Sequence, residues 1–506
     1  MRLLILFPET EHSVQIVKFP PYGIACIAAY LKENNPYISL EVKGCRNKDV
    51  LSLMETLEFS KYDIIAIGFT TPNSAWVYEK TKLIKQAYSD LICLHGGIHP
   101  TIDPFSSLES GADIVVRGEG EETLSELLEM VHLHRKDYFQ YLDNIQGIHF
   151  LRAGQMISTP QRPLIKDLDK IPLPDWTIFN LDIYNGKDFT LPLMGARGCN
   201  FSCNFCCSPI IWRQHIRYRS PEIVVNEMQY NIDNFKFFKY RFLDDDFLAN
   251  PKFARDVCQL ILERDLNIEF VIFARCDSVN RNKDILELMS KAGLREVEIG
   301  VENASSEVLT NMNKKITFDD TELAVSLLKK YNIKIFYLLI FAYPGETLES
   351  ICITNQYINR LKDTNNELIY GQYLVPYPGT KLAETCEEDG ILIERNYSNY
   401  ISTDIVYLPF SILDQKPFAI CKPNKQQLDA MCASYINASR TLGIRKVKEY
   451  IEMICNLSDG TRSVQDIIYS FINNFKLNSK FAHKFVYRFI NYLAQFNCIQ
   501  NSADSV

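Results

Sequence analysis

Short apolar runs alternate with helical patterns along the first 135 residues of the chain. Apolar runs bounded by polar residues predict buried strands over 3–7, 39–43, 64–68, 92–95 and 114–116. Apolar positions at helical spacing predict helices over 24–32, 50–59, 75–88 and 122–131. Strands separated by helices favour a parallel sheet that is covered on both faces. Residues 1–135 are therefore predicted to form a doubly wound, Rossmann-like α/β domain with its ligand crevice at the C-terminal strand ends.

A second strand–helix series starts at residue 189, after a connector over 136–188 that contains several prolines and a hairpin signal at 147–150 and 155–158. Strands are predicted over 191–194, 240–243, 269–273, 296–300, 334–340 and 370–375. The helices between them are predicted over 221–231, 251–264, 283–292, 318–331 and 347–361. Six such units are fewer than the eight of a closed barrel, so a partial, open barrel is expected over 189–395.

The alternation ends near residue 396. Helical patterns then predict a third, smaller and mostly helical domain over 396–506, with helices over 425–441, 444–455, 463–474 and 482–496.

Composition narrows the class of protein. The 506 residues are 47% hydrophobic and 23% charged, which is ordinary for globular proteins. A net charge of −8 gives no reason to expect nucleic acid as a partner. No apolar run reaches 18 residues, and the N-terminus is predicted to be a strand, so neither a membrane span nor a signal peptide is expected. Fifteen cysteines without a secretion signal indicate reduced thiols and a cytoplasmic protein.

Three cysteines, Cys199, Cys203 and Cys206, follow the first predicted barrel strand at CxxxCxxC spacing. Three thiolates can hold three irons of a [4Fe–4S] cluster and leave the fourth open, whereas cluster sites that only transfer electrons normally have four. Zinc is the alternative, but it would require a fourth ligand, for which His215 is the next candidate. Cys207 is expected to be a buried small hydrophobic residue.

Charged residues end the next barrel strands. Asp244, Asp245 and Asp246 follow the second strand, where carboxylates bind a metal, bind a ligand ammonium or hydroxyl, or cap the next helix. Arg275 ends the third strand, where a surface salt bridge is the simpler interpretation.

These motifs together resemble the radical S-adenosylmethionine (SAM) superfamily, since Arg197-Gly198 precedes the cysteines and Phe205 stands before the last of them. The resemblance implies a [4Fe–4S] cluster on Cys199, Cys203 and Cys206, whose open iron binds the amino and carboxylate groups of SAM. It implies further SAM contacts from Asp244, Asp245, Arg275, Glu302 and Lys314. Two positions depart from the usual pattern, because Asp246 replaces a small residue and Ala342 replaces a glycine.

A Rossmann-like domain in front of such a barrel resembles the cobalamin-dependent class. Glycines at strand ends simply terminate strands in many proteins, but here the resemblance implies cobalamin contacts from Tyr22, Gly23, Thr70, Gly96, Gly97, His99, Gly118 and Glu119. No Asp-x-His-x-x-Gly motif is present, which implies either cobalamin without a protein histidine ligand or a domain that has lost the cofactor.

The resemblance implies a C-methyltransferase that acts on an unactivated carbon through a 5′-deoxyadenosyl radical, with an external one-electron reductant such as flavodoxin or ferredoxin. A non-methylating enzyme that rearranges, cyclises or couples its substrate is one alternative, and a non-catalytic module that binds a peptide or cobalamin is another. The substrate is a small molecule or a peptide. Residues 457–499 faintly resemble winged-helix domains that bind leader peptides by strand addition, and a helical cap without a partner is the other interpretation.

Overall fold

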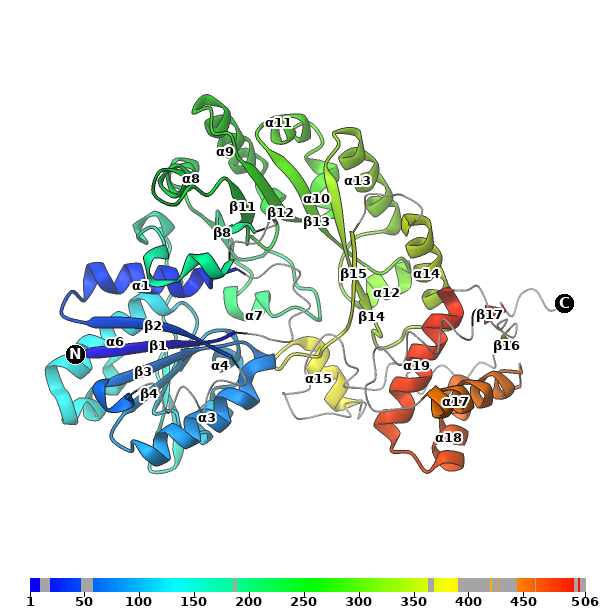
Figure 1. Ribbon diagram of the computed structural model, residues 1–506, viewed down its shortest axis with the longest axis horizontal. Helices are drawn as coiled ribbons and strands as arrows, with labels where there is room; N and C mark the ends of the chain where they lie inside the picture. The colour runs from blue at the N-terminus through cyan, green and yellow to red at the C-terminus, as the bar shows by residue number, and fades with distance from the viewer. Residues whose placement is uncertain are drawn as a thin grey trace.

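The computed structural model describes residues 1–9, 19–46, 58–184, 189–362, 368–389, 419–420, 427, 444–459, 461–495 and 499–500. These residues form two α/β domains and a helical one in succession along the chain (Figure 1). In this part of the chain, no helix combines the length and apolar character needed to cross a membrane.

The first domain is built on a seven-stranded sheet of order β2-β1-β3-β4-β5-β6-β7. Five strands run parallel to one another, namely β1 (Arg2–Glu9), β2 (Ser39–Arg46), β3 (Ile64–Gly68), β4 (Ile92–Gly96) and β5 (Ile114–Val116). Alternate residues of β1 enter different cores, because Leu3 and Ile5 pack with one apolar cluster and Leu4 and Leu6 with another. The sheet is thus buried on both faces, which confirms the doubly wound prediction.

Helices cover both faces of this sheet (Figure 1). They are α1 (Tyr22–Asn34), α3 (Ser74–Ala87) and α6 (Gly120–His134), with the short α4 (Ile98–Ile102) and α5 (Pro104–Glu109) after β4. Single-turn or 3₁₀ segments are η1 (Phe59–Lys61), η2 (Thr71–Asn73) and η3 (Arg135–Asn144). Most of the helix predicted over 50–59 lies outside the described residues.

The predicted hairpin in the connector forms, but it belongs to the first sheet. Strand β6 (Ile148–Arg152) pairs antiparallel with β5, and β7 (Gln155–Ser158) pairs antiparallel with β6. The connector continues through three 3₁₀ turns, η4 (Leu168–Lys170), η5 (Trp176–Ile178) and η6 (Leu181–Tyr184). Trp176 is buried there, with its ring 6.0 Å from that of Tyr22. The connector therefore packs against α1 instead of running free.

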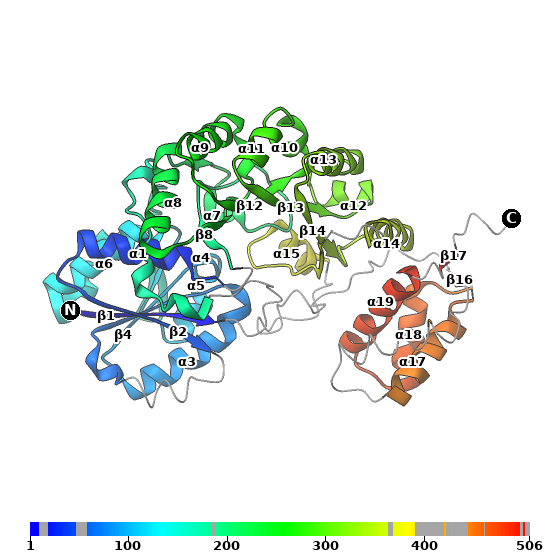
Figure 2. The same ribbon diagram turned by 45° about the horizontal axis from the view of Figure 1, so that its top comes forward.

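The second domain is a parallel six-stranded sheet of order β8-β11-β12-β13-β14-β15, which confirms the partial barrel. Its strands are β8 (Leu191–Leu193), β11 (Lys239–Phe242), β12 (Glu269–Arg275), β13 (Leu294–Glu302), β14 (Lys334–Phe341) and β15 (Leu368–Tyr373). Among the described residues, β8 and β15 do not pair with each other, so the barrel stays open. Figure 2 shows the strands as an arc with helices on its outer side.

The outer helices are α8 (Pro221–Phe235), α9 (Pro251–Glu263), α10 (Cys276–Arg281), α11 (Leu286–Lys291), α12 (Ser306–Asn311), α13 (Phe318–Lys330), α14 (Leu348–Lys362) and α15 (Lys381–Glu388). They include the five that the sequence predicts, which correspond to α8, α9, α11, α13 and α14, and three short ones that it does not predict, α10, α12 and α15. Ser220 and Asn250 cap α8 and α9, each followed by proline, and Thr317 and Asp320 form a capping box on α13.

The third domain contains α17 (Ile444–Leu457), α18 (Val464–Phe475) and α19 (Ser479–Gln495), and a short ladder joins β16 (Ala419–Ile420) to β17 (Ile499–Gln500). Its helices pack on aromatic side chains around Tyr450. Helix α19 lies along α14 of the barrel in both views (Figures 1 and 2). Nearly all of the helix predicted over 425–441 lies outside the described residues.

Candidate active site

The three cysteines lie in a hairpin whose two sides are held together at its base. Strand β9 (Ala196–Arg197) pairs antiparallel with β10 (Arg217–Tyr218), and the loop between them includes the short helix α7 (Ser208–Trp212). Gly198 has φ +118°, and a Cβ there would lie 1.8 Å from the carbonyl oxygen of His215. Only glycine fits this position, which explains the residue directly before Cys199.

The hairpin brings the three thiols together. Cys199, Cys203 and Cys206 are partly exposed and free of disulfides, and they lie close enough to act electrostatically on one another. Burial raises the pKa of Cys199 to about 12 and also raises the pKa of Cys206, so these two thiols carry protons until iron displaces them. Within the described ranges, no three His, Cys, Asp or Glu side chains are placed to hold a single metal ion. Three free thiols on one loop fit a cluster, and the exposed His215, the candidate fourth zinc ligand, is hydrogen-bonded to the Arg213 carbonyl of its own turn.

Cys207 differs from its prediction, because it is partly exposed and not buried. It lies at the start of α7, where the chain turns away from the third cysteine.

One carboxylate of the acidic triplet faces the cysteines. Asp245 is exposed, accepts a hydrogen bond of 2.9 Å from the Ser208 hydroxyl, and lies within electrostatic range of Cys199 and Cys206. An accessible carboxylate beside the thiols fits the ammonium group of SAM.

The other two acids point into the protein. Asp244 accepts a hydrogen bond of 2.9 Å from the Gly195 amide, and burial raises its pKa to about 7. Asp246 accepts a hydrogen bond from the Ser278 hydroxyl, and burial raises its pKa to about 6. Both carboxylates therefore brace the strand end, and the predicted SAM contact of Asp244 stays a prediction.

Arg275 connects the cysteine loop to the barrel. Its guanidinium lies 3.6 Å from the centroid of the Phe201 ring, and Nη1 lies 3.9 Å from the sulfur of Cys203. Its Nη2 donates to the carbonyl of Lys314 at 2.6 Å. Its Nε also pairs with Oδ1 of Asp277 at 2.9 Å, so a salt bridge does form, but Arg275 is buried at the cluster loop instead of lying on the surface.

Glu302 and Lys314 form a buried ion pair with an Nζ–Oε1 distance of 2.5 Å. Glu302 has φ +64°, and a Cβ on Gly300 would lie 2.6 Å from its carboxylate, so the pair fills the space beside the strand. Asn313 donates to the carbonyl of Ser202 in the cysteine loop. The pair and this loop contact hold the predicted SAM residues near the cysteines.

The predicted cobalamin residues line the C-terminal edge of the first sheet. Thr70, Gly97 and Gly23 are exposed, and a Cβ on Gly23 or Gly118 would touch nothing. Gly97 has φ +97° and packs on the Phe69 backbone, while Gly96 ends β4. This open glycine edge fits a large flat ligand that approaches the backbone closely.

His99 is not available as a cobalt ligand in this conformation. Its Nδ1 lies 3.0 Å from the Thr71 hydroxyl and its Nε2 lies 2.8 Å from the Tyr78 hydroxyl. Burial lowers the pKa of His99 to about 4, so the ring is neutral at pH 7. The residue supports the loop after β4, which agrees with the absence of a histidine-ligand motif.

Glu119 and Tyr22 join the first domain to the barrel. Glu119 pairs with Arg197 and Arg217 at 2.8 Å each, and Glu121 pairs with Arg197 at 2.6 Å. We call these four side chains, Glu119, Glu121, Arg197 and Arg217, the clamp; each is at most 11% exposed. The clamp ties the base of the cysteine hairpin to the domain with the glycine edge, so the cobalamin contact of Glu119 stays a prediction.

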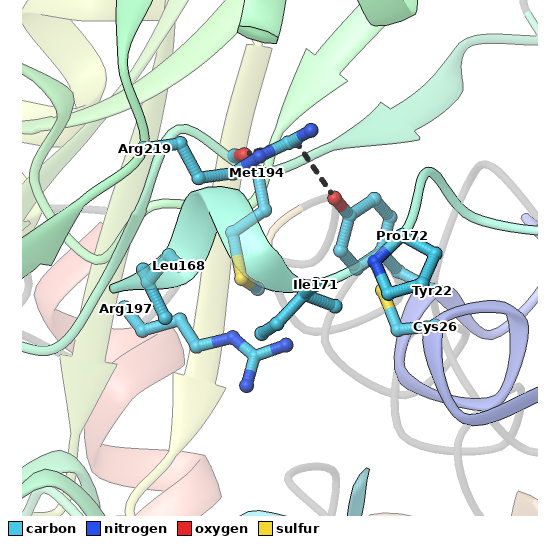
Figure 3. A pocket seen from close by; sticks show the side chains of 8 residues that line it. All are labelled: Tyr22, Cys26, Leu168, Ile171, Pro172, Met194, Arg197 and Arg219. Atoms are coloured by element: carbon cyan, nitrogen blue, oxygen red, sulfur yellow. Dashed lines mark hydrogen bonds between the residues drawn. The ribbon is translucent and has the colours of Figure 1, made fainter. Parts of the chain in front are cut away.

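Tyr22 contacts the barrel beside the clamp. The Arg219 guanidinium donates to the Tyr22 hydroxyl at 3.2 Å (Figure 3). It also pairs with Glu227 at 2.6 Å. A small pocket is lined there by Tyr22, Cys26, Leu168, Ile171, Pro172, Met194, Arg197 and Arg219 (Figure 3). Sequence reasoning missed Arg217, Arg219, Glu121 and Glu227 as interface residues, because charged residues far apart in the sequence give no spacing signal.

Family comparisons agree with this arrangement. Residues 193–358 match the radical SAM superfamily, and residues 17–128 match the B12 binding domain. The chain is 30% identical over 424 residues to an uncharacterized methyltransferase, PH0819, of Pyrococcus horikoshii, covering 80% of this chain and 87% of that protein. It is 28% identical to an anaerobic magnesium-protoporphyrin IX monomethyl ester cyclase of Rubrivivax gelatinosus, a match that covers 79% of this chain and 73% of that protein.

A solved structure shares the fold along nearly the whole chain. It is the cobalamin-dependent S-adenosylmethionine radical enzyme OxsB with aqua-cobalamin and SAM bound. The TM-score is 0.68 at 16% identity, and the match covers 98% of this chain and 79% of that one.

Proposed function

Because this chain belongs to the radical SAM superfamily and carries a B12-binding domain before its barrel, we propose that it is a C-methyltransferase acting on an unactivated carbon. It is an enzyme whose cofactors are a [4Fe–4S] cluster, SAM and cobalamin, so the alternative of a non-catalytic module falls away. The observation that carries the proposal is the clamp, since it links the cysteine hairpin directly to the cobalamin domain.

When bound, the cluster and SAM supply a 5′-deoxyadenosyl radical and cobalamin supplies a methyl group. The part of this chain's residues is to bind and orient. We propose that Asp245 accepts hydrogen bonds from the SAM ammonium, and that Arg275 keeps the cysteine loop in place through Phe201. The buried Glu302–Lys314 pair adds no net charge to the pocket.

The open glycine edge of the first domain and the cysteine hairpin of the second are proposed to face a common substrate space. A rigid docking between the two domains favours transfer between two cofactors, because effective molarity depends on fixed geometry. The substrate, a small molecule or a peptide, and an external one-electron reductant such as flavodoxin or ferredoxin complete the proposal.

A non-methylating cyclase or coupling enzyme is the second candidate. It is favoured by the similarity to the magnesium-protoporphyrin IX monomethyl ester cyclase. That match covers 79% of this chain, against 80% for the methyltransferase relative.

The deciding experiment is an anaerobic assay of the protein reconstituted with iron, sulfide and cobalamin, then given SAM and dithionite. Formation of both 5′-deoxyadenosine and S-adenosylhomocysteine supports methyl transfer, because the second product records a methyl group leaving SAM. Deoxyadenosine without S-adenosylhomocysteine, from protein with bound reduced cobalamin, refutes methyl transfer and supports the second candidate. Cys203→Ala is the control, and it should abolish deoxyadenosine while leaving the cobalamin absorption spectrum in place.

A further inference from the structure

The hydroxyl of Tyr487, on helix α19, reaches the end of barrel strand β14. Tyr487 is fully buried, and its hydroxyl donates to Oε2 of Glu346 at 2.6 Å. The same hydroxyl accepts the amide N–H of Ala342 at 2.7 Å, and this N–H also lies 2.9 Å from Oε2 of Glu346. The third domain thus supplies part of the hydrogen bonding of a barrel turn.

That turn has a conformation that its sequence disfavours. Ala342 has φ +67°, a left-handed conformation that alanine rarely adopts and that glycine adopts freely. A non-glycine residue keeps such a conformation only when surrounding contacts hold it. The two acceptors on the Ala342 amide are such contacts, and one of them belongs to α19.

The contacts continue from this turn toward the cysteine loop. Oε1 of Glu346 accepts a hydrogen bond of 2.9 Å from the side-chain amide of Asn303, and Asn303 directly follows Glu302 in the chain. Glu302 pairs with Lys314, whose backbone carbonyl holds the Arg275 guanidinium. Arg275 in turn lies against the cysteine loop, so polar contacts, joined at one step by the peptide link between Glu302 and Asn303, connect Tyr487 to the loop that carries Cys203.

Apolar packing follows the same route. One hydrophobic core contains buried residues of α17, α18 and α19 together with Met312, Ile340 and Ala342 of the barrel. Phe205, between the second and third cluster cysteines, packs against this core. No boundary separates the third domain from the SAM side of the barrel in this core.

We propose that Tyr487 is a positioning residue through which the C-terminal domain holds the SAM pocket in its binding conformation. The inference rests on the same SAM site as the proposed function, but it does not depend on methyl transfer. It assigns the third domain a role in cofactor binding that is independent of any peptide.

Tyr487→Phe tests the inference, because it removes only the hydroxyl and keeps the ring in its core. SAM is titrated into the dithionite-reduced holoprotein, and the dissociation constant is read from the change in the electron paramagnetic resonance spectrum of the cluster. We expect SAM binding to weaken by up to about tenfold, the upper end of what one ordinary hydrogen bond contributes. The cluster spectrum without SAM should stay unchanged.

Tyr450→Phe is the matched control, since Tyr450 is a buried tyrosine of the same domain that packs in the aromatic core away from Glu346. SAM affinity should change less than about twofold in this variant. A Tyr487→Phe protein with a lower melting temperature but unchanged SAM affinity overturns the inference, because a purely structural role gives that result.

If Tyr487→Phe does not fold, Glu346→Gln is titrated instead, and unchanged affinity there overturns the inference. Where Tyr487→Phe does fold, it is combined with Glu346→Gln: an affinity loss no larger than the larger of the two single losses supports the inference, whereas additive losses contradict it. The proposed function fails separately, when the wild-type protein binds SAM but forms no S-adenosylhomocysteine.

Discussion

Glu119→Gln should weaken the docking of the first domain on the barrel by about 3 kcal/mol. Removing one partner from a buried ion pair typically costs about 3–5 kcal/mol, since the remaining charge stays buried. In the clamp, two guanidiniums face two carboxylates, and the substitution leaves two positive charges against one negative. Arg197 keeps Glu121, but Arg217 keeps only the Ile165 carbonyl and the ring of Trp212 among its described partners. Because Arg197 keeps a carboxylate partner, we expect a cost at the lower end of the range, about 3 kcal/mol.

Glu126→Gln is the matched control, because it makes the same change within α6, the helix that directly follows Glu119. Glu126 pairs with Arg162 but is 40% exposed, and exposed pairs contribute about 1 kcal/mol or less. Urea denaturation of both variants, followed by tryptophan fluorescence and circular dichroism, compares the free energies of unfolding. Trp176 reports on the interface directly, since it packs against Tyr22.

The pH dependence gives a second measurement of the clamp. Burial alone would raise the pKa of Glu119, but Arg197 and Arg217 outweigh it and hold the pKa below the ordinary value of 4.5. A lowered carboxyl pKa adds stability above pH 4.5 that is lost as the pH falls through the lowered value. The Glu119→Gln protein should lack this part of the stability, so its free energy of unfolding should change less with pH in the acid range. If Glu119→Gln costs no more than Glu126→Gln, or if Glu119→Gln and Arg217→Gln are simply additive, the clamp does not hold the domains together.

Three further predictions concern the site. Gly198→Ala should prevent the cysteine hairpin from closing and lower the iron content after reconstitution by more than half. Gly154→Ala is the control, because Gly154 also has a positive φ but has open space around it; the free energy of unfolding in urea should fall by only about 1 kcal/mol. Burial lowers the pKa of His95 to about 3 and of His99 to about 4, so both residues add stability that is lost as the pH falls below 6.5. His99→Asn should make the free energy of unfolding depend less on pH in this acid range, and it should not shift the absorption bands of bound cobalamin. Arg275→Lys should weaken SAM binding at least tenfold in the spectroscopic titration, because lysine cannot reproduce both the ring contact and the bond to Lys314; an unchanged affinity would contradict this role.

Apolar runs predicted the strands well, because strands of a parallel sheet are buried on both faces and read as short continuous hydrophobic segments. Strands β3 and β5 have the predicted bounds, and the barrel strands β8, β11, β12, β13, β14 and β15 lie within a few residues of theirs, whereas β9 and β10 were not predicted. The hairpin over 148–158 was predicted, but its membership of the first sheet was not. Pairing between β5 and β6 is a tertiary contact that periodicity does not report.

The cluster cysteines were predictable because their spacing is local. The roles of the three adjacent acids were not, since the sequence alone does not say which way a strand end turns. Alternation along an extended chain could have indicated that Asp245 faces opposite to Asp244 and Asp246. The partners of Glu119 lie 78 and 98 residues further along the chain, and no spacing rule connects them.

The clamp also has a consequence for how the iron site is made. Its two carboxylates belong to the domain that leaves the ribosome first, and domains generally fold in the order of synthesis. The cysteine hairpin is therefore completed against a surface that already exists, and iron delivery follows the docking of two domains. A barrel produced alone would lose both the cover and the counter-charges of Arg197 and Arg217 at the base of the cysteine hairpin, so it is a poor substitute for the whole protein in studies of cluster assembly.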